Sequence, residues 1–188
     1  GWNDFAFIYE EGETIYDWEQ TDEQGVKYTL RLDEDGSKYY SVTGHADELY
    51  TEVVIPADLD GCPVRSIEAA VFKGCTNLES IVIPDSVTSI GSYALWNCSS
   101  LRMVISKIST PFDIGAFNDV STNQAILVVP KDSRDDYKNV SGWGLPFIYE
   151  EGETIYDKEQ VDEQGVKYTL RQDGDGSIYY SVTGHTDE

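Results

Sequence analysis

The sequence predicts a mainly β fold, a short solenoid with coils of 23 residues that is preceded by a β-hairpin. Residues 64–86 and 87–109 align with a spacing of 23, and their apolar side chains recur at the same phase. This recurrence is typical of a solenoid, in which each coil stacks its inward side chains on those of its neighbours. Between residues 25 and 45, apolar and polar residues alternate on both sides of a turn signal, which predicts the hairpin.

The two full coils match position by position. The matched pairs are Val64 and Val87, Ile67 and Ile90, Phe72 and Leu95, Cys75 and Cys98, Leu78 and Leu101, and Ile81 and Val104. Partial coils flank them at 53–56 and at 126–130, where a β-branched run ends in proline. We therefore expect two full and two partial coils.

The hairpin has its own pattern. Val26, Tyr28, Leu30 and Leu32 alternate with polar residues, the acidic stretch 33–36 ends in a glycine that suits a turn, and alternation resumes at 40–42. Because an isolated hairpin is only marginally stable in water, we expect it to dock on the first coil and cover the open edge of the solenoid.

A longer repeat surrounds the coils. Residues 7–48 recur at 147–188 with an offset of 140, and only six of the 42 positions differ. Gly1-Trp2 likewise echoes Gly142-Trp143. The chain is therefore expected to be a piece of an array of units of about 140 residues. The expected division is an end of the preceding unit with an acidic linker (1–24), a hairpin cap (25–45), the solenoid with its closing strand (46–140) and the start of the next unit (141–188).

The coil residues resemble a known family. Leu-x-x-Ile-x-Ile-Pro at 78–84, Val-Thr-Ser-Ile-Gly at 87–91 and the Ala-Leu-x-x-Cys turn at 94–98 resemble the BspA-type leucine-rich repeat. The resemblance covers roughly residues 50–130. It departs from the family at Leu95, where Phe is usual, and at 105–107, where Ile-Ser-Lys replaces Ile-Pro-x. It implies an extracellular protein of a bacterial cell surface that adheres to protein or glycan partners.

Charge and hydropathy exclude several classes of partner. The chain of 188 residues carries 35 acidic and 13 basic residues, a formal net charge of −22. Such a surface repels phosphate backbones and anionic membranes, so neither nucleic acid nor a bilayer is an expected partner. No apolar run approaches the roughly 20 residues that cross a membrane, and the opening residues do not read as a leader peptide.

The sequence does not predict an enzyme. Its two histidines, His45 and His185, are copies of one repeat position, and no Ser/His/Asp or Cys/His set and no phosphate-binding glycine loop is visible. Carboxylates are so abundant that proximity between two of them carries little information. We expect no cofactor.

No metal site is expected either. Cys75 and Cys98 should stack about 5 Å apart on neighbouring coils, where parallel side chains would strain a disulfide, so buried free thiols are favoured. Residues 33–37 and 173–177 resemble the start of a calcium loop, but no Glu follows at the twelfth position, which favours a plain turn.

Two features are candidate binding sites. If Leu78, Ile81 and Ile83 point inward, Val82 points outward, and its counterparts on the other coils are Val54, Ile105 and Val128. This exposed apolar row would mark a contact unless the hairpin or a neighbouring unit covers it. Trp96 is the second candidate, an outward anchor for a protein or a sugar ring unless it packs sideways on the next coil.

Three functions stay open. The first is a repeated adhesion module that binds protein or glycan with avidity. The second is a spacer or stalk, and the third is an accessory domain of a secreted hydrolase. Residues 147–188 are expected to be an orphan half-unit without coils to cap, able to dock on a neighbouring molecule.

Overall fold

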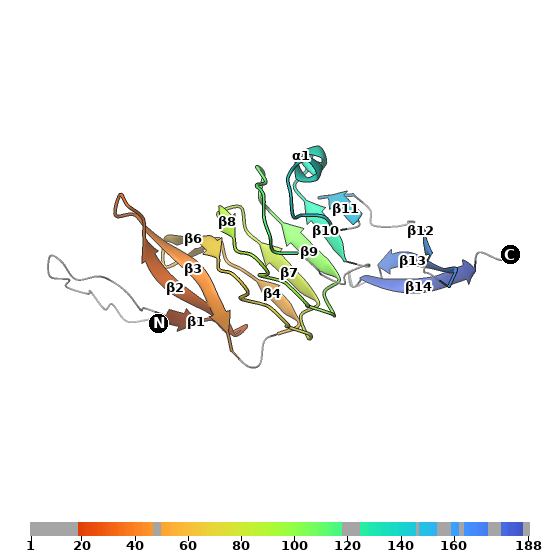
Figure 1. The fold of residues 1–188 in the computed structure, drawn as a ribbon, viewed down its shortest axis with the longest axis horizontal. Helices are drawn as coiled ribbons and strands as arrows, with labels where there is room; N and C mark the ends of the chain where they lie inside the picture. The colour runs from red at the N-terminus through yellow and green to blue at the C-terminus, as the bar shows by residue number, and fades with distance from the viewer. Residues whose placement is uncertain are drawn as a thin grey trace.

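The computed structural model describes residues 19–46, 50–117, 125–145, 147–153, 159–161, 164–172 and 178–185. The first elements are β1 (Glu19–Thr21), β2 (Val26–Leu32), β3 (Lys38–His45), β4 (Glu52–Val54), β5 (Asp58–Leu59), β6 (Cys62–Ile67), β7 (Ser80–Ile83) and β8 (Ser89–Ile90). They are followed by β9 (Met103–Ser106), β10 (Ile126–Val129), α1 (Arg134–Asn139), β11 (Phe147–Glu150), β12 (Glu159–Val161), β13 (Val166–Gln172) and β14 (Ile178–His185). Figure 1 shows an elongated molecule with β1, β2 and β3 towards one end, the strands of the coils in the middle and β12, β13 and β14 towards the other end.

One side of the solenoid is a parallel sheet of five strands in the order β11-β10-β9-β7-β4. Ile81 of β7 pairs with Val104 of β9, its counterpart in the sequence alignment of the two full coils. Met103 of β9 in turn pairs with Ile126 of β10, which is the same distance further along the chain. The coil length predicted from the sequence is therefore confirmed.

The other side is a sheet of six strands, in which β1, β2, β3, β6 and β5 follow in order and β8 pairs with β6. The predicted hairpin is β2 and β3. Its second strand lies parallel to β6, with Tyr40 beside Val64 and Val42 beside Ile67, so the hairpin continues the sheet onto the first coil. Strand β1 pairs with β2 and lies in the segment expected to be a linker. Its residues alternate without apolar side chains, which is why the pattern did not predict it.

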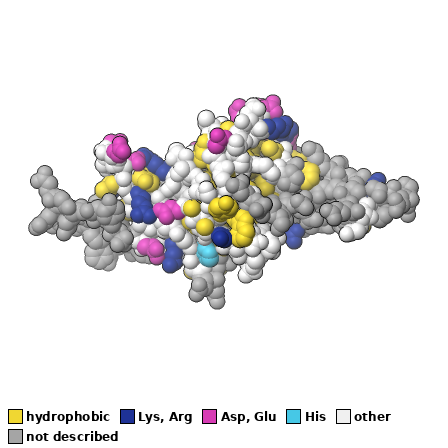
Figure 2. Space-filling model, in the orientation of Figure 1, with side chains coloured by type: hydrophobic (Ala, Val, Ile, Leu, Met, Phe, Trp, Pro, Cys, Tyr) yellow, Lys and Arg dark blue, Asp and Glu magenta, His cyan; other side chains and the backbone are white. Residues whose placement is uncertain are grey.

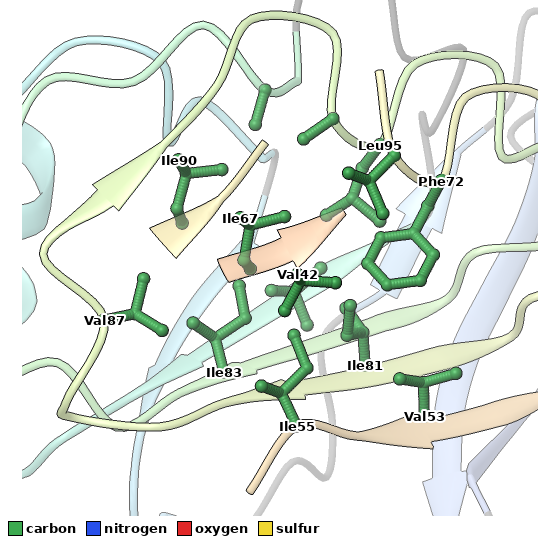
Figure 3. Close-up of a cluster of buried hydrophobic side chains, with 14 of the residues drawn as sticks. Val42, Val53, Ile55, Ile67, Phe72, Ile81, Ile83, Val87, Ile90 and Leu95 are labelled. Atoms are coloured by element: carbon green, nitrogen blue, oxygen red, sulfur yellow. The ribbon is translucent and has the colours of Figure 1, made fainter. Parts of the chain in front are cut away.

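The core lies between the two sheets. In Figure 3, Ile67 and Ile90 approach from one side, and Ile81 and Ile83 approach from the other. Ile81 and Ile83 are fully buried, and Ile67 and Ile90 are 2% and 7% exposed. Leu78 and Leu101, one coil apart, are exposed by 0% and 3%. The shared phase of the coils therefore builds one continuous apolar column.

The turns repeat as faithfully as the strands. Ala70 and Tyr93, at equivalent positions of successive coils, both have a left-handed backbone, with φ of 58° and 60°. Gly74 and Asn97 form a second such pair, with φ of 76° and 60°. The N–H of Gly74 donates to the carbonyl of Trp96 at 2.8 Å, which ties the two turns together. Successive coils therefore stack through their turns as well as through their strands.

The far end of the solenoid is closed by residues assigned from sequence to the next unit. Strand β11 extends the parallel sheet beside β10, with Phe147 next to Ile126. Trp143 and Leu145, which precede it, are 1% and 6% exposed. The expectation that residues 147–188 lack coils to cap is therefore wrong for 147–150, because these residues pair with the last coil of their own chain. Strands β12, β13 and β14 form a separate sheet of three strands.

Strands β13 and β14 reproduce the first hairpin. Thr169 pairs with Ser181 as Thr29 pairs with Ser41, and both hairpins shift register at the same position, after Lys27 and after Lys167. In the described part of the chain, no helix is long and apolar enough to cross a bilayer.

Candidate binding surface

The four residues of the predicted outward row lie side by side on the five-stranded sheet. Val54 pairs with Val82, Val82 with Ile105 and Ile105 with Val128. Their strand neighbours Val53, Ile81, Val104 and Leu127 are all fully buried, so the row occupies the opposite, outer face. The phase argument placed the row correctly. Its role in binding stays a prediction.

The outer face holds a second apolar set that the sequence analysis missed. Two members of this set, Met103 and Ile126, precede Ile105 and Val128 by two residues on β9 and β10 and so lie on the same face. The other two, Phe147 and Tyr149, lie on β11, where they pair with Ile126 and Val128. Ile126 and Tyr149 form a small buried cluster against which Met103, Val128 and Phe147 pack. Alternation along β9 and β10 could have predicted Met103 and Ile126. Phe147 and Tyr149 could not be placed there without knowing that β11 joins this sheet.

The two ends of the face differ in exposure. Ile126 and Tyr149 are only 2% and 5% exposed, whereas Val54 at the other end is 52% exposed. Val82 and Ile105, between them, are half-buried. We refer to Val54, Val82 and Ile105 as the open row, the part of the outer face that a partner could reach.

The turn between β1 and β2 supports the edge strand β4 at the exposed end of the open row. The side-chain amide of Gln24 donates to the Val54 carbonyl at 2.9 Å and accepts from the Val54 N–H at 2.7 Å. Asp22 holds the turn that presents Gln24, since its carboxylate accepts from the Gln24 and Val26 N–H groups at 2.9 Å and from the Tyr28 hydroxyl at 2.8 Å. An edge strand with unpaired backbone groups invites pairing with other chains, and Gln24 reduces that hazard at β4.

Trp96 lies elsewhere, in the turn between β8 and β9. It is half-buried, and the ammonium of Lys73 on the preceding coil lies 4.8 Å from its ring centroid. This arrangement is a cation–π contact. The contact is with the preceding coil, whereas the sequence analysis considered packing on the next coil, and the role of Trp96 as a binding anchor stays a prediction. Figure 2 shows hydrophobic, basic and histidine side chains gathered near the middle of the face in view.

The fold brings together a Cys/His pair that the sequence did not reveal. The Cys75 thiol lies 3.3 Å from His45 Nε2, and His45 Nδ1 lies 2.7 Å from the Ala46 carbonyl oxygen. A carbonyl can only accept, so Nδ1 carries the hydrogen and Nε2 accepts from the thiol. The two residues are distant in sequence and meet only because β3 lies beside β6. No spacing motif could have found them.

Burial keeps the Cys75 thiol in its neutral form. It raises the pKa of the Cys75 thiol to about 11, which disfavours the thiolate that a nucleophile requires. The pair is therefore a structural contact rather than an activated nucleophile. All three cysteines are free, and Cys98, the stacked counterpart of Cys75, is fully buried and donates to the Phe72 carbonyl at 3.1 Å.

Two carboxylates of the acidic turn at 33–36 bind neighbouring protein groups. The Asp35 carboxylate accepts from the Ser37 N–H at 2.8 Å and from its hydroxyl at 2.5 Å, and the hydroxyl's hydrogen bond lowers the pKa of Asp35. Asp33 forms an ion pair with Arg65. These contacts fit a hairpin turn. The second copy, 173–177, lies outside the described residues. Within the described ranges, no group of three or more His, Cys, Asp or Glu side chains could hold a metal ion.

A hollow of about 520 Å³ lies between α1 and the segment that precedes β11. Of its three aromatic members, Phe147 is half-buried, and Tyr137 and Trp143 are each only 1% exposed, so neither of these two offers a ring face to a ligand. Its basic members are paired, Arg134 with Glu153 and Lys138 with Asp135. The hollow is therefore a weaker candidate than the open row.

Coils of equal length whose apolar side chains stack in phase define a leucine-rich-repeat solenoid. A family model described as "BspA type Leucine rich repeat region" matches residues 49–133 in six copies. The match covers the stretch, roughly residues 50–130, whose sequence resembles the BspA-type leucine-rich repeat, and so confirms that resemblance.

Two solved structures are similar to the chain. A leucine rich cell surface protein from Faecalibacterium prausnitzii aligns with 86% of this chain at 17% identity and a TM-score of 0.45. This chain covers 60% of that structure. A leucine-rich repeat protein from Bacteroides capillosus aligns with 72% of this chain and all of its own length, at 25% identity and a TM-score of 0.49. Among curated proteins, no match is found.

Proposed function

We propose that the chain is a binding module of a bacterial cell-surface protein and that the open row contacts a protein partner. The observation that carries this proposal is the alignment of Val54, Val82 and Ile105 on one outer sheet face, with Val54 52% exposed at its edge. Aligned apolar side chains at a surface favour association, because contact removes them from water.

The chemistry of the row favours a protein over a glycan. Its members are aliphatic, whereas sugar rings are usually held against aromatic faces. The Trp96 ring, the alternative platform, already carries Lys73 at 4.8 Å. The partner is therefore expected to present an apolar patch of its own.

Charge refines the description of the partner. With a net charge of −22, the chain repels acidic proteins at long range and attracts basic ones. We infer that the partner has a basic rim around its apolar contact. Repetition of the unit in an array would raise the apparent affinity of each weak contact through avidity.

An array of purified extracellular proteins and glycans tests this proposal. The chain is expected to bind basic proteins and no glycan, and Val82→Glu is expected to weaken that binding at least about tenfold, since it places a charge inside an apolar contact. Thr88→Glu, at an exposed position just before β8, adds the same charge away from the open row and should leave binding unchanged. Equal loss in both variants, or binding to glycans alone, would overturn the proposal.

A spacer is the second candidate function. The observation that favours it is the repetition of the hairpin register in β13 and β14, because equivalent elements on successive units suit a regular stalk. Small-angle scattering of proteins with one, two and three units tests it. The spacer function is supported if the radius of gyration grows in proportion to the number of units and if no purified protein or glycan binds the chain. An accessory domain of a secreted hydrolase is a third reading that no particular contact favours.

A further inference from the structure

The end of the solenoid is completed by a segment of which the Gly-Trp pair and the last seven residues occur a second time in the chain. We call residues 142–153 the closing segment. Its strand β11 pairs with β10 over four residues, from Phe147 beside Ile126 to Glu150 beside Val129. The Glu151 N–H then donates to the Val129 carbonyl at 2.8 Å, which extends the pairing beyond the strand.

An aromatic anchor precedes the strand. The Trp143 ring packs edge-on against Tyr137 at 5.0 Å and lies 5.9 Å from Phe117. Its Nε1 donates to the Phe112 carbonyl at 2.8 Å. Trp143 is 1% exposed, so the last coil and α1 form a pocket that encloses its side chain.

Basic groups recognise the acidic end of the closing segment. Lys107 forms an ion pair with Glu151, and Arg134 forms one with Glu153. The Arg134 N–H also donates to the Glu150 carboxylate at 3.0 Å. In a chain with 13 basic and 35 acidic residues, two cations at one end are a specific complement to Glu-Glu-Gly-Glu. We call β10, the Trp143 pocket, Lys107 and Arg134 the closing site.

The first thirteen residues repeat every feature that the closing site recognises. Residues 7–13 are Phe-Ile-Tyr-Glu-Glu-Gly-Glu, identical to 147–153, and Gly1-Trp2 matches Gly142-Trp143 with one more residue before the strand sequence. Residues 1–18 lie outside the described residues. The described ranges contain one closing site, and residues 142–153 of the same chain fill it.

We propose that residues 1–13 are a second closing segment, whose binding site is the closing site of another copy of this unit. Each unit of an array would then be completed by the first residues of the sequence repeat that follows it. The mode is strand addition, in which main-chain hydrogen bonds to β10 supply affinity and the Trp pocket and the two cations supply specificity. Within one chain, residues 142–153 occupy the closing site in preference to residues 1–13, because their attachment to the last coil gives them a high effective concentration there.

Releasing the tethered segment in the full chain tests the proposal. Ile148→Pro with Tyr149→Pro removes N–H donors from β11 and should free the closing site. The released chain is expected to associate head to tail, with a mass by light scattering that rises at least twofold with concentration. The matched variant that also carries Ile8→Pro and Tyr9→Pro should stay monomeric. A folded monomer in the first case, or association that persists in the second, would overturn the proposal.

A peptide keeps the test decisive if the released chain unfolds. A synthetic peptide of residues 1–13 should restore β circular dichroism to that chain and raise its Tm, and the same peptide with Ile8→Pro, Tyr9→Pro and Trp2→Ala should do neither. No change with the native peptide at millimolar concentration would contradict the proposal. Neither readout involves an external partner, so a result that contradicts this proposal would not contradict the proposed binding role of the open row.

Discussion

Gln24 and Val54, 30 residues apart, exchange two hydrogen bonds, in which the side-chain amide of Gln24 pairs with the backbone of Val54 as a neighbouring strand would. The turn between β1 and β2, which carries Gln24, thereby protects the edge of the five-stranded sheet at the exposed end of the open row. Edge protection of this kind limits unwanted pairing between chains.

Replacing Gln24 with Ala is therefore expected to leave the fold intact but expose the edge of β4. The free energy of unfolding should fall by about 1 kcal/mol, because two exposed hydrogen bonds are lost. Urea denaturation measures that loss, and light scattering should show increased self-association. Gln20→Ala in β1, on the far strand of the other sheet, is the control and should not increase self-association. A Gln24→Ala chain that scatters like the wild type would contradict this role.

Gly142 is expected to tolerate no side chain. Its φ is +90°, and an added Cβ would lie 1.7 Å from the carbonyl oxygen of Ile114. Gly142→Ala should cost about 3 kcal/mol through the clash and the left-handed backbone, visible as a lower Tm. Gly144→Ala, where nothing lies within 4 Å of the added Cβ, is the matched control and should change the Tm little. Equal effects at the two positions would show that residues 142–145 are not seated as described.

Alkaline pH is expected to destabilise the fold through Cys98. Burial raises the pKa of its thiol from 9.0 to about 12, so the folded state keeps a proton that the unfolded state loses. The stabilisation from this thiol is complete below pH 9 and is lost as the pH rises towards 12. Urea denaturation at several pH values should therefore show a steeper loss of stability above pH 9 for the wild type than for Cys98→Ala. Parallel pH profiles would contradict the burial of an un-ionised thiol at this position.

The repeated phase of apolar residues was enough to predict the coils and the outward row, and alternation on both sides of a turn signal predicted the hairpin. Residues one coil apart occupy equivalent positions, so side chains such as Val82 and Ile105 could be placed on one face from the sequence alone. Contacts between segments of different phase could not be predicted in this way. The hydrogen bonds of Gln24 to Val54 and the contact of His45 with Cys75 both depend on how β1, β2 and β3 dock on the coils, and no repeat encodes that docking.

The extent of the solenoid shows the same limit. Identity between residues 7–48 and 147–188 assigned Trp143 and Phe147 to the next unit, because a sequence repeat records duplication rather than packing. The structure places these residues against the last coil, since the edge of β10 and the pocket around Tyr137 would otherwise be open. The boundary of the sequence repeat and the boundary of the folded solenoid therefore differ at this end by the length of the closing segment.

The most direct test of the stacked coils is a double-mutant cycle between Ile81 and Val104, buried neighbours on β7 and β9. Ile81→Ala should cost about 2–5 kcal/mol, and its coupling to Val104→Ala should be at least about 0.5 kcal/mol. Val53→Ala with Leu127→Ala, on strands three places apart in the same sheet, should be additive. The free energies of unfolding are measured by urea denaturation. Coupling in the first pair alone supports in-phase stacking of the coils. Additive effects of Ile81→Ala and Val104→Ala would contradict it.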